Sequence, residues 1–160
     1  MEIRSVITTS NSGRRELVGF RVGEQAFCID ITSVIEIRGW TPTTPLPQAP
    51  DYMKGVVNLR GLVLPIIDLA ARLGLPTKEP SARHAIMVVK CGDRTVGLLV
   101  EAVSDIVELD DSARQETPEL GDGAGGSGVI AGIFAVDGEM ISLLDLDNVL
   151  PQAVQDAQAA

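Results

Sequence analysis

The side chains that could perform chemistry in this 160-residue chain are few and widely separated. The single histidine, His84, has no nearby cysteine and no Glu-x-x-His arrangement, and no Gly-x-Ser-x-Gly motif offers it a serine nucleophile. Cys28 and Cys91 each lie in an apolar run without a second Cys or His at ligand spacing. We therefore expect no catalytic residue, no metal and no cofactor. The protein would function by binding other molecules.

Other polar features have structural explanations. The tract Gly121–Gly128, GDGAGGSG, lacks the Gly-Lys-Ser/Thr ending of a phosphate-binding loop and opens no helix, so we interpret it as a flexible loop. Carboxylates such as Asp145 and Asp147 stand where a helix begins, and capping explains them. The two cysteines fit small core hydrophobes in a reducing cytoplasm better than a disulfide, which stays the alternative.

One short polar segment stands out between two strongly apolar strands. It is Asn58-Leu59-Arg60-Gly61, which predicts a cationic hairpin tip in an acidic protein. The ordinary interpretation of Arg60 is a solvated residue at a sheet edge. The alternative is that its planar guanidinium is presented to a carboxylate or carbonyl of a partner. The residues alone leave both open.

A second segment, residues 34–40 (VIEIRGW), raises a similar question. In a regular strand Val34 and Glu36 share one face, and Ile35 and Ile37 share the other. We expect the isoleucine face to pack in the core and the Val/Glu face to point outward.

The elements that must position these residues are predominantly strands. Val and Ile together contribute 30 residues, whereas Phe, Trp and Tyr contribute five. The predicted strands cover residues 17–22, 26–31, 33–38, 56–60, 62–67, 85–91, 95–100, 104–109, 129–136 and 139–144, separated by tight turns. Short helices are predicted over 68–73 and 145–150, each opened by an Asp that can cap it. The pattern is typical of an all-β barrel or sandwich.

The charge of the chain excludes several classes of partner. With 13 Lys and Arg against 22 Asp and Glu, the net charge is −9, the wrong sign for binding nucleic acid or an anionic membrane. The longest apolar runs hold about half a dozen residues, far fewer than a bilayer needs, and no signal peptide is evident. We expect a soluble cytoplasmic protein without membrane insertion.

The sequence also contains an internal duplication. Shifting it by 77 positions places GVVNLRGLVLPIIDL, from Gly55, on GIFAVDGEMISLLDL, from Gly132. Shifting it by 69 aligns Val34 with Val103 and Glu36-Ile37 with Asp105-Ile106, and the difference of eight fits an insertion at 121–128. We predict two small barrels packed together in one domain over residues 14–151, with flexible ends at 1–13 and 152–160.

Two stretches carry a resemblance to a known family. Residues 34–40 resemble the V-x-E-I-R-G-aromatic run of the CheW coupling proteins of bacterial chemotaxis. Residues 54–69, KGVVNLRGLVLPIIDL, resemble that family's K-G-x-x-N-L-R-G-x-x-x-P-x-x-D-L signature. The match spans about residues 16–150, with a looser likeness at 103–107 and 137–141.

The resemblance implies a fold of two intertwined five-stranded SH3-like β-barrels and a scaffold that is not an enzyme. Its partners would be the cytoplasmic tip of methyl-accepting chemoreceptors and the regulatory domain of the histidine kinase CheA, in arrays at the inner membrane. The implied receptor-binding residues are Val34, Glu36, Gly55, Asn58 and Arg60, and the implied kinase-binding residues are Glu119 and Leu120. Leu120 stands where the family commonly has an aromatic residue.

Two other functions stay open at this stage. One is an adaptor of the same kind in a parallel chemosensory system that drives pili or second-messenger output, which nothing in the chain distinguishes. The other is a small β-barrel enzyme or ligand carrier that uses the glycine-rich loop.

Overall fold

The computed structural model describes residues 14–110, 115, 129–136 and 138–150, which form ten strands and three short helical turns. The strands are β1 (Arg14–Val22), β2 (Gln25–Asp30), β3 (Val34–Gly39), β4 (Met53–Leu59), β5 (Leu62–Asp68), β6 (Ala85–Cys91), β7 (Arg94–Val100), β8 (Ala102–Asp110), β9 (Ile130–Val136) and β10 (Glu139–Leu144). The helical turns are η1 (Ile31–Ser33), a 3-10 helix, and α2 (Leu69–Arg72) and α3 (Leu146–Val149). The predicted all-β class is confirmed. The predicted flexible ends, 1–13 and 152–160, and the tract 121–128 lie outside the described residues.

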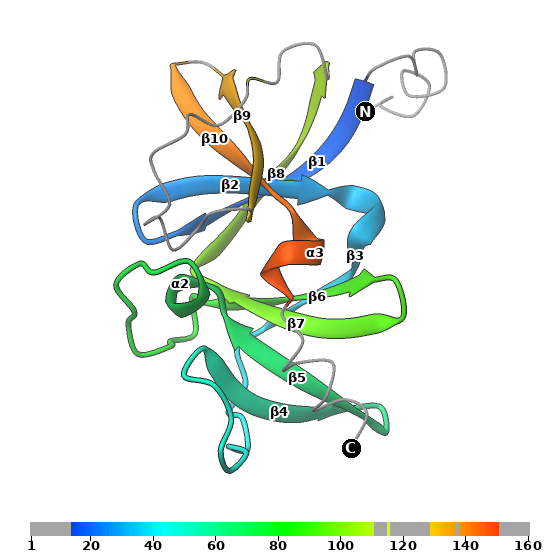
Figure 1. Cartoon of the computed structure of the whole chain (residues 1–160), viewed down its shortest axis with the longest axis vertical. Helices are drawn as coiled ribbons and strands as arrows, with labels where there is room; N and C mark the ends of the chain where they lie inside the picture. The colour runs from blue at the N-terminus through cyan, green and yellow to red at the C-terminus, as the bar shows by residue number, and fades with distance from the viewer. Residues whose placement is uncertain (1–13, 111–114, 116–128, 137, 151–160) are drawn as a thin grey trace.

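The strands form two five-stranded sheets that exchange strands between the halves of the sequence. Sheet A has the order β8-β1-β2-β10-β9, and sheet B has the order β3-β6-β7-β5-β4. Sheet A therefore takes only β1 and β2 from the first half of the sequence, and sheet B takes only β6 and β7 from the second. Figure 1 shows the two sheets one above the other, with α3 between them. The two barrels are intertwined, as the resemblance implied.

The strand order agrees with the predicted duplication. Strands β1 to β5 correspond in order to β6 to β10, because each sheet contains one edge strand, one antiparallel pair and one hairpin in equivalent places. Each sheet also contains one parallel pair at the equivalent junction, β2 with β10 in sheet A and β5 with β7 in sheet B. Neither half of the sequence supplies a complete sheet, so each barrel needs strands from both halves.

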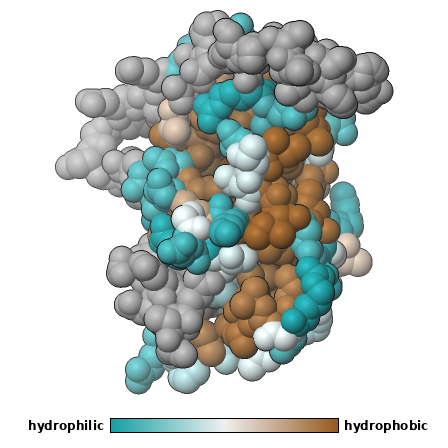
Figure 2. Space-filling model, turned by 90° about the vertical axis from the view of Figure 1, so that its right-hand side faces the viewer, coloured by the Kyte–Doolittle hydropathy of each residue, from teal (hydrophilic) through white to brown (hydrophobic). Residues whose placement is uncertain are grey.

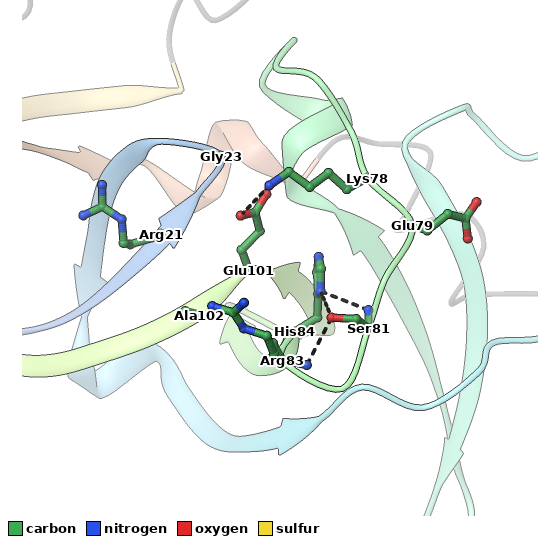
Figure 3. A pocket seen from close by; sticks show the side chains of 9 residues that line it. All are labelled: Arg21, Gly23, Lys78, Glu79, Ser81, Arg83, His84, Glu101 and Ala102. Carbon is green, nitrogen blue, oxygen red and sulfur yellow. Dashed lines mark hydrogen bonds and ion pairs between the residues drawn. The ribbon is translucent and has the colours of Figure 1, made fainter.

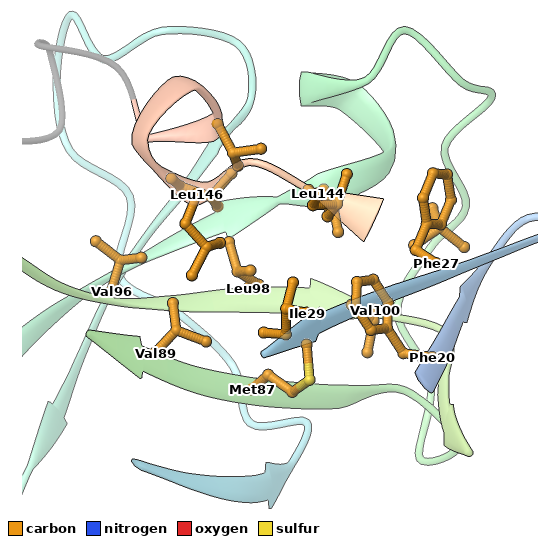
Figure 4. Packing of buried hydrophobic residues seen from close by; sticks show 14 of the residues in the cluster. Phe20, Phe27, Ile29, Met87, Val89, Val96, Leu98, Val100, Leu144 and Leu146 are labelled. Carbon is orange, nitrogen blue, oxygen red and sulfur yellow. The ribbon is translucent and has the colours of Figure 1, made fainter. Parts of the chain in front are cut away.

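The largest hydrophobic core lies between the two sheets and belongs to both. Figure 4 shows aromatic and aliphatic side chains of β1 and β2 meeting those of β6, β7, β10 and α3. The rings of Phe20 and Phe27 stack with centroids 5.9 Å apart. Two smaller cores fill the individual barrels, one around Leu64 and Ile66 in sheet B and one around Phe134 in sheet A.

The two short helices are capped as predicted and are tied together. Each begins after an aspartate whose Oδ1 accepts a backbone N–H two residues later, Asp68 at α2 and Asp145 at α3. Arg72, in the last turn of α2, donates from Nε to the Val149 carbonyl at 3.0 Å and from Nη2 to the Asn148 carbonyl at 2.7 Å. One guanidinium therefore satisfies two carbonyls at the carboxyl end of α3, and it joins the equivalent helices of the two repeats.

Replacing that guanidinium tests whether the helix connection stabilises the fold. We expect Arg72→Ala to lower the free energy of unfolding by about 1–3 kcal/mol, because two carbonyls lose a charged donor. Urea unfolding measures the loss, with Lys90→Ala as a control, since Lys90 is an exposed cation on β6. If Arg72→Ala lowered the free energy of unfolding no more than the control does, the connection between the helices would contribute nothing to stability.

Candidate functional site

The predicted cationic tip is a two-residue hairpin turn with an unusual backbone. Arg60 and Gly61 join β4 to β5 and both have positive φ, 52° and 89°, as a type I′ turn requires. An arginine rarely adopts this left-handed conformation. The Asn58 Oδ1 accepts the Gly61 N–H at 3.0 Å and thereby holds the turn. Asn58 thus fixes the position from which the Arg60 side chain extends.

The guanidinium of Arg60 bonds to a carboxylate on the opposite edge of the same sheet. Its Nη2 lies 2.6 Å from Oε1 of Glu36, and Nη1 of Arg38 lies 3.0 Å from Oε2 of the same carboxylate. Glu36 belongs to β3 at one edge of sheet B, and the hairpin ends at β4, the other edge. We call Glu36, Arg38 and Arg60 the Glu36 cluster. It connects the two edges of sheet B across the open side of the barrel.

The two arginines lower the pKa of the Glu36 carboxyl below its ordinary value of 4.5. The hydrogen bond from Arg60 is the largest cause, and the bond from Arg38 is the second. The Arg60 side chain is 67% exposed and that of Glu36 is 25% exposed. The cluster is therefore accessible to solvent and salt, and its attraction is screened accordingly.

The structure reverses the expected orientation of β3. Ile35 and Ile37 were expected in the core, but they are 51% and 47% exposed. The cause is a β-bulge, since Val34 pairs with Val89 whereas Glu36 pairs with Val88. Val34 consequently shares the face of the large core, and the next polar positions, Glu36 and Arg38, turn toward the mouth of the small core of sheet B. Val34 and Glu36 do not share one face.

Gly55 has a structural role in the placement of β4. Its φ is 142°, and a Cβ atom there would lie 2.4 Å from the carbonyl oxygen of Thr44. The segment before β4 crosses at this point, with Thr44 and Val56 exchanging two backbone hydrogen bonds of 2.9 Å. Any side chain at position 55 would displace that segment. Gly55 supports the hairpin without offering a side chain of its own.

The predicted receptor-binding residues therefore fall into two groups. Glu36, Asn58 and Arg60 meet at one edge of the barrel. Val34 packs at the large core, and Gly55 lies against Thr44. The predicted kinase-binding residues, Glu119 and Leu120, lie outside the described residues.

Exposed apolar side chains neighbour the Glu36 cluster along the chain, and the sequence alone did not predict their exposure. Leu62 and Val63, directly after the hairpin turn, are 50% and 58% exposed. Ile35 and Ile37 stand on either side of Glu36 in β3. Figure 2 shows brown, apolar surface on the face that lies at the right-hand side of Figure 1, extending from the middle of the molecule toward its lower end. Exposed apolar residues that neighbour exposed charged residues along the chain are typical of an interaction surface. The sequence gives no signal that β3 is an edge strand.

The remaining candidate groups do not assemble a reactive site. Both cysteines are free; burial raises the pKa of Cys28 to about 12, and burial is also the largest cause of the raised pKa of Cys91. Cys28 is a core residue as expected, whereas Cys91 is only half-buried and its thiol donates to Asp147 at 2.8 Å. His84 is half-buried. In the described part of the chain, no three His, Cys, Asp or Glu residues could jointly hold a metal ion, and no helix is long and apolar enough to span a membrane.

Comparison with known proteins identifies what the chain is similar to. Residues 16–154 match the family model of the CheW-like domain. The chemotaxis protein CheW of Rhizobium meliloti (strain 1021) is 51% identical over 146 residues, which cover 91% of this chain and 94% of that protein. The probable chemotaxis protein CheW of Rhizobium etli is 49% identical, over 94% of this chain and 97% of that protein. The crystal structure of the scaffolding protein TtCheW from Thermoanaerobacter tengcongensis superposes with a TM-score of 0.77 at 28% identity, covering 85% of this chain and 92% of that one.

The lowered pKa of Glu36 predicts how the cluster responds to pH. A carboxyl whose pKa is depressed by folding stabilises the fold above its unfolded pKa, and this contribution disappears as the pH falls through the folded pKa. We therefore expect Glu36→Gln to be less stable than the wild type at pH 7, with a difference that shrinks below pH 4.5. Urea unfolding of both proteins across that range measures it. A difference that stays constant through this acidic range would rule out the ionised carboxylate as its origin.

Proposed function

The chain belongs to the CheW-like family, and we propose that it couples chemoreceptors to CheA through the surface around the Glu36 cluster and a second surface at Glu119 and Leu120. It is a chemotaxis adaptor. It would hold its partners in fixed positions relative to one another and would catalyse no reaction. Its place would be the cytoplasm, at receptor arrays on the inner membrane, and one domain over residues 14–151 would carry both surfaces.

The observation that carries the receptor surface is the exposed arginine with exposed apolar neighbours. A receptor tip is a hairpin of amphipathic helices, which present rows of apolar side chains beside polar ones. Ile35, Ile37, Leu62 and Val63 offer apolar area to such a helix, and burying them would remove that area from water. The chain thus provides the two kinds of contact that a helix face needs.

Arg60 can serve a partner while it stays bonded to Glu36. A guanidinium has five N–H donors in a rigid plane, and the contact with Glu36 involves the Nη2 end of that plane. Glu36 would then act as a positioning residue that fixes the plane, and the remaining donors would face a carboxylate or carbonyl on the receptor helix. Asn58 and Gly55 would act indirectly. Asn58 would hold the turn, and Gly55 would allow the segment at Thr44 to pack against β4.

Two arginines of the same cluster provide a matched test of this surface. We expect Arg60→Ala to weaken binding to a purified receptor tip by about 2–5 kcal/mol, because the complex would leave a charged partner group desolvated and unpaired. Arg38→Ala removes the other cation from Glu36 but leaves the hairpin tip intact, and we expect a loss under ~1 kcal/mol.

Equal losses in the two variants would contradict a specific role for Arg60, and so would a loss under ~1 kcal/mol for Arg60→Ala. Thermal melting followed by circular dichroism is the control for folding. The same variants should retain binding to the kinase's regulatory domain, since the proposed kinase-binding residues, Glu119 and Leu120, are not members of the Glu36 cluster.

The kinase surface has its own test. We expect Leu120→Ala to weaken binding to the regulatory domain of CheA by about 1–3 kcal/mol, the loss typical of truncating an apolar interface residue, and to leave binding to the receptor tip unchanged. Titration of the purified domains against each other measures both affinities. If Leu120→Ala weakened receptor binding and spared kinase binding, the assignment of the two surfaces would be wrong.

A parallel chemosensory system would use an adaptor with the same surfaces. Identifying the receptors and kinase that co-purify with the chain distinguishes flagellar output from pili or second-messenger output.

A further inference from the structure

We propose that a second site, remote from the Glu36 cluster, binds the phosphate group of a small dissolved compound of nucleotide size. The site is a pocket that brings cations of two separate elements together with a histidine ring whose outer nitrogen is a donor. It lies beyond the proposed adaptor function, which assigns no ligand to this region.

The pocket lies where the chain passes from sheet B to sheet A. Its walls are the loop between α2 and β6, the turn between β1 and β2, and the junction of β7 with β8. At the junction the Glu101 N–H donates to the Arg21 carbonyl at 3.0 Å, which fixes one wall to the other. The pocket has a volume of about 380 Å³ and is partly open to solvent. This volume lies within the range of small-molecule sites. Figure 3 shows the side chains that line it.

The cations of the pocket differ in how they are neutralised. Arg21 pairs with Glu139 at 2.9 Å, and Lys78 pairs with Glu101 at 3.4 Å. Arg83 has no ion pair with any carboxylate in the described residues. Figure 3 shows that Glu79, the other acidic residue of the lining, points away from the rest. An arginine that has no carboxylate partner in the described part of the chain and stands at a pocket wall favours an anionic ligand.

The histidine adds a directed donor. The Ser81 N–H donates to Nδ1 of His84 at 3.1 Å, so this nitrogen is an acceptor and the neutral ring carries its proton on Nε2. Ser81 Oγ also accepts the Arg83 N–H at 3.2 Å, which holds the two basic residues in one turn. In Figure 3 the outer ring nitrogen points toward the side of the pocket where Lys78 and Glu101 pair. Nε2–H and the Arg83 guanidinium therefore supply donors from different directions.

This donor set suits a phosphate group better than other anions. A phosphate has three oxygens that accept from several directions at once, and an arginine fork with additional N–H donors matches that arrangement. A chain of net charge −9 is repelled by an anionic membrane or by nucleic acid, so a lipid headgroup or a polynucleotide is not the expected source. The remaining source is a dissolved phosphate compound that fits a volume of about 380 Å³.

Titration of the full ¹⁵N-labelled chain with inorganic pyrophosphate, and separately with ADP, tests the proposal. We expect saturable amide shifts that concentrate at Ser81–His84 and Glu101–Ala102, and no saturable shift with acetate at the same ionic strength. Arg83→Gln should weaken binding at least about tenfold, as the loss of a charge-assisted bond does.

Lys90→Gln is the matched control, because it removes one exposed cation from β6 outside this pocket. It should leave the affinity unchanged. Equal weakening by the two variants, or no saturation up to about 10 mM pyrophosphate, would overturn the proposal. Receptor binding of Arg83→Gln should equal that of the wild type, so failure here leaves the adaptor function untouched.

Discussion

The exchange of strands between the two repeats is the constraint on which the rest of the structure depends. Each sheet combines strands of both halves of the sequence, and the largest core packs residues of both sheets. Neither half can bury its apolar strands alone, since its sheet would lack members and its core would lack one wall. The parallel pairs β2 with β10 and β5 with β7 join the two halves of the sequence by backbone hydrogen bonds. Arg72 also joins the halves, since it connects α2 to the end of α3. The two barrels are therefore joined through the large core that they share.

The ion pair between Glu36 and Arg60 is a feature of the first repeat, and the equivalent sequence positions of the second repeat carry different residues. Sheet B has Glu36 on its edge strand and Arg60 on its hairpin tip, and the two pair at 2.6 Å. The corresponding sequence positions of the second repeat are Asp105 and Asp137, the latter outside the described residues. Two carboxylates repel each other, so the second repeat cannot form this pair. The equivalent positions of the two repeats therefore differ in charge.

The sequence predicted the elements well because their signals are local. Ten strands, the capping residues Asp68 and Asp145, and the hairpin turn at Arg60 all follow from spacing within a few residues. The predicted orientation of β3 was wrong because a bulge after Val34 changes the face on which the later residues of the strand lie. A bulge leaves no pattern in the sequence. The pairing of Arg60 with Glu36, 24 positions apart, depends on how the sheet curls. That curl also decides which apolar residues, such as Ile35 and Val63, stay exposed.

Native-state hydrogen exchange tests the central claim, that the interlocked repeats form one rigid connector. The slowest amides of β2 and β10 in sheet A and of β6 and β7 in sheet B are predicted to exchange through one opening, with the same free energy and the same dependence on denaturant. If the amides of one sheet exchanged through a separate opening of lower free energy while the other sheet stayed protected, the barrels would be independent units and the repeats would not form one rigid connector.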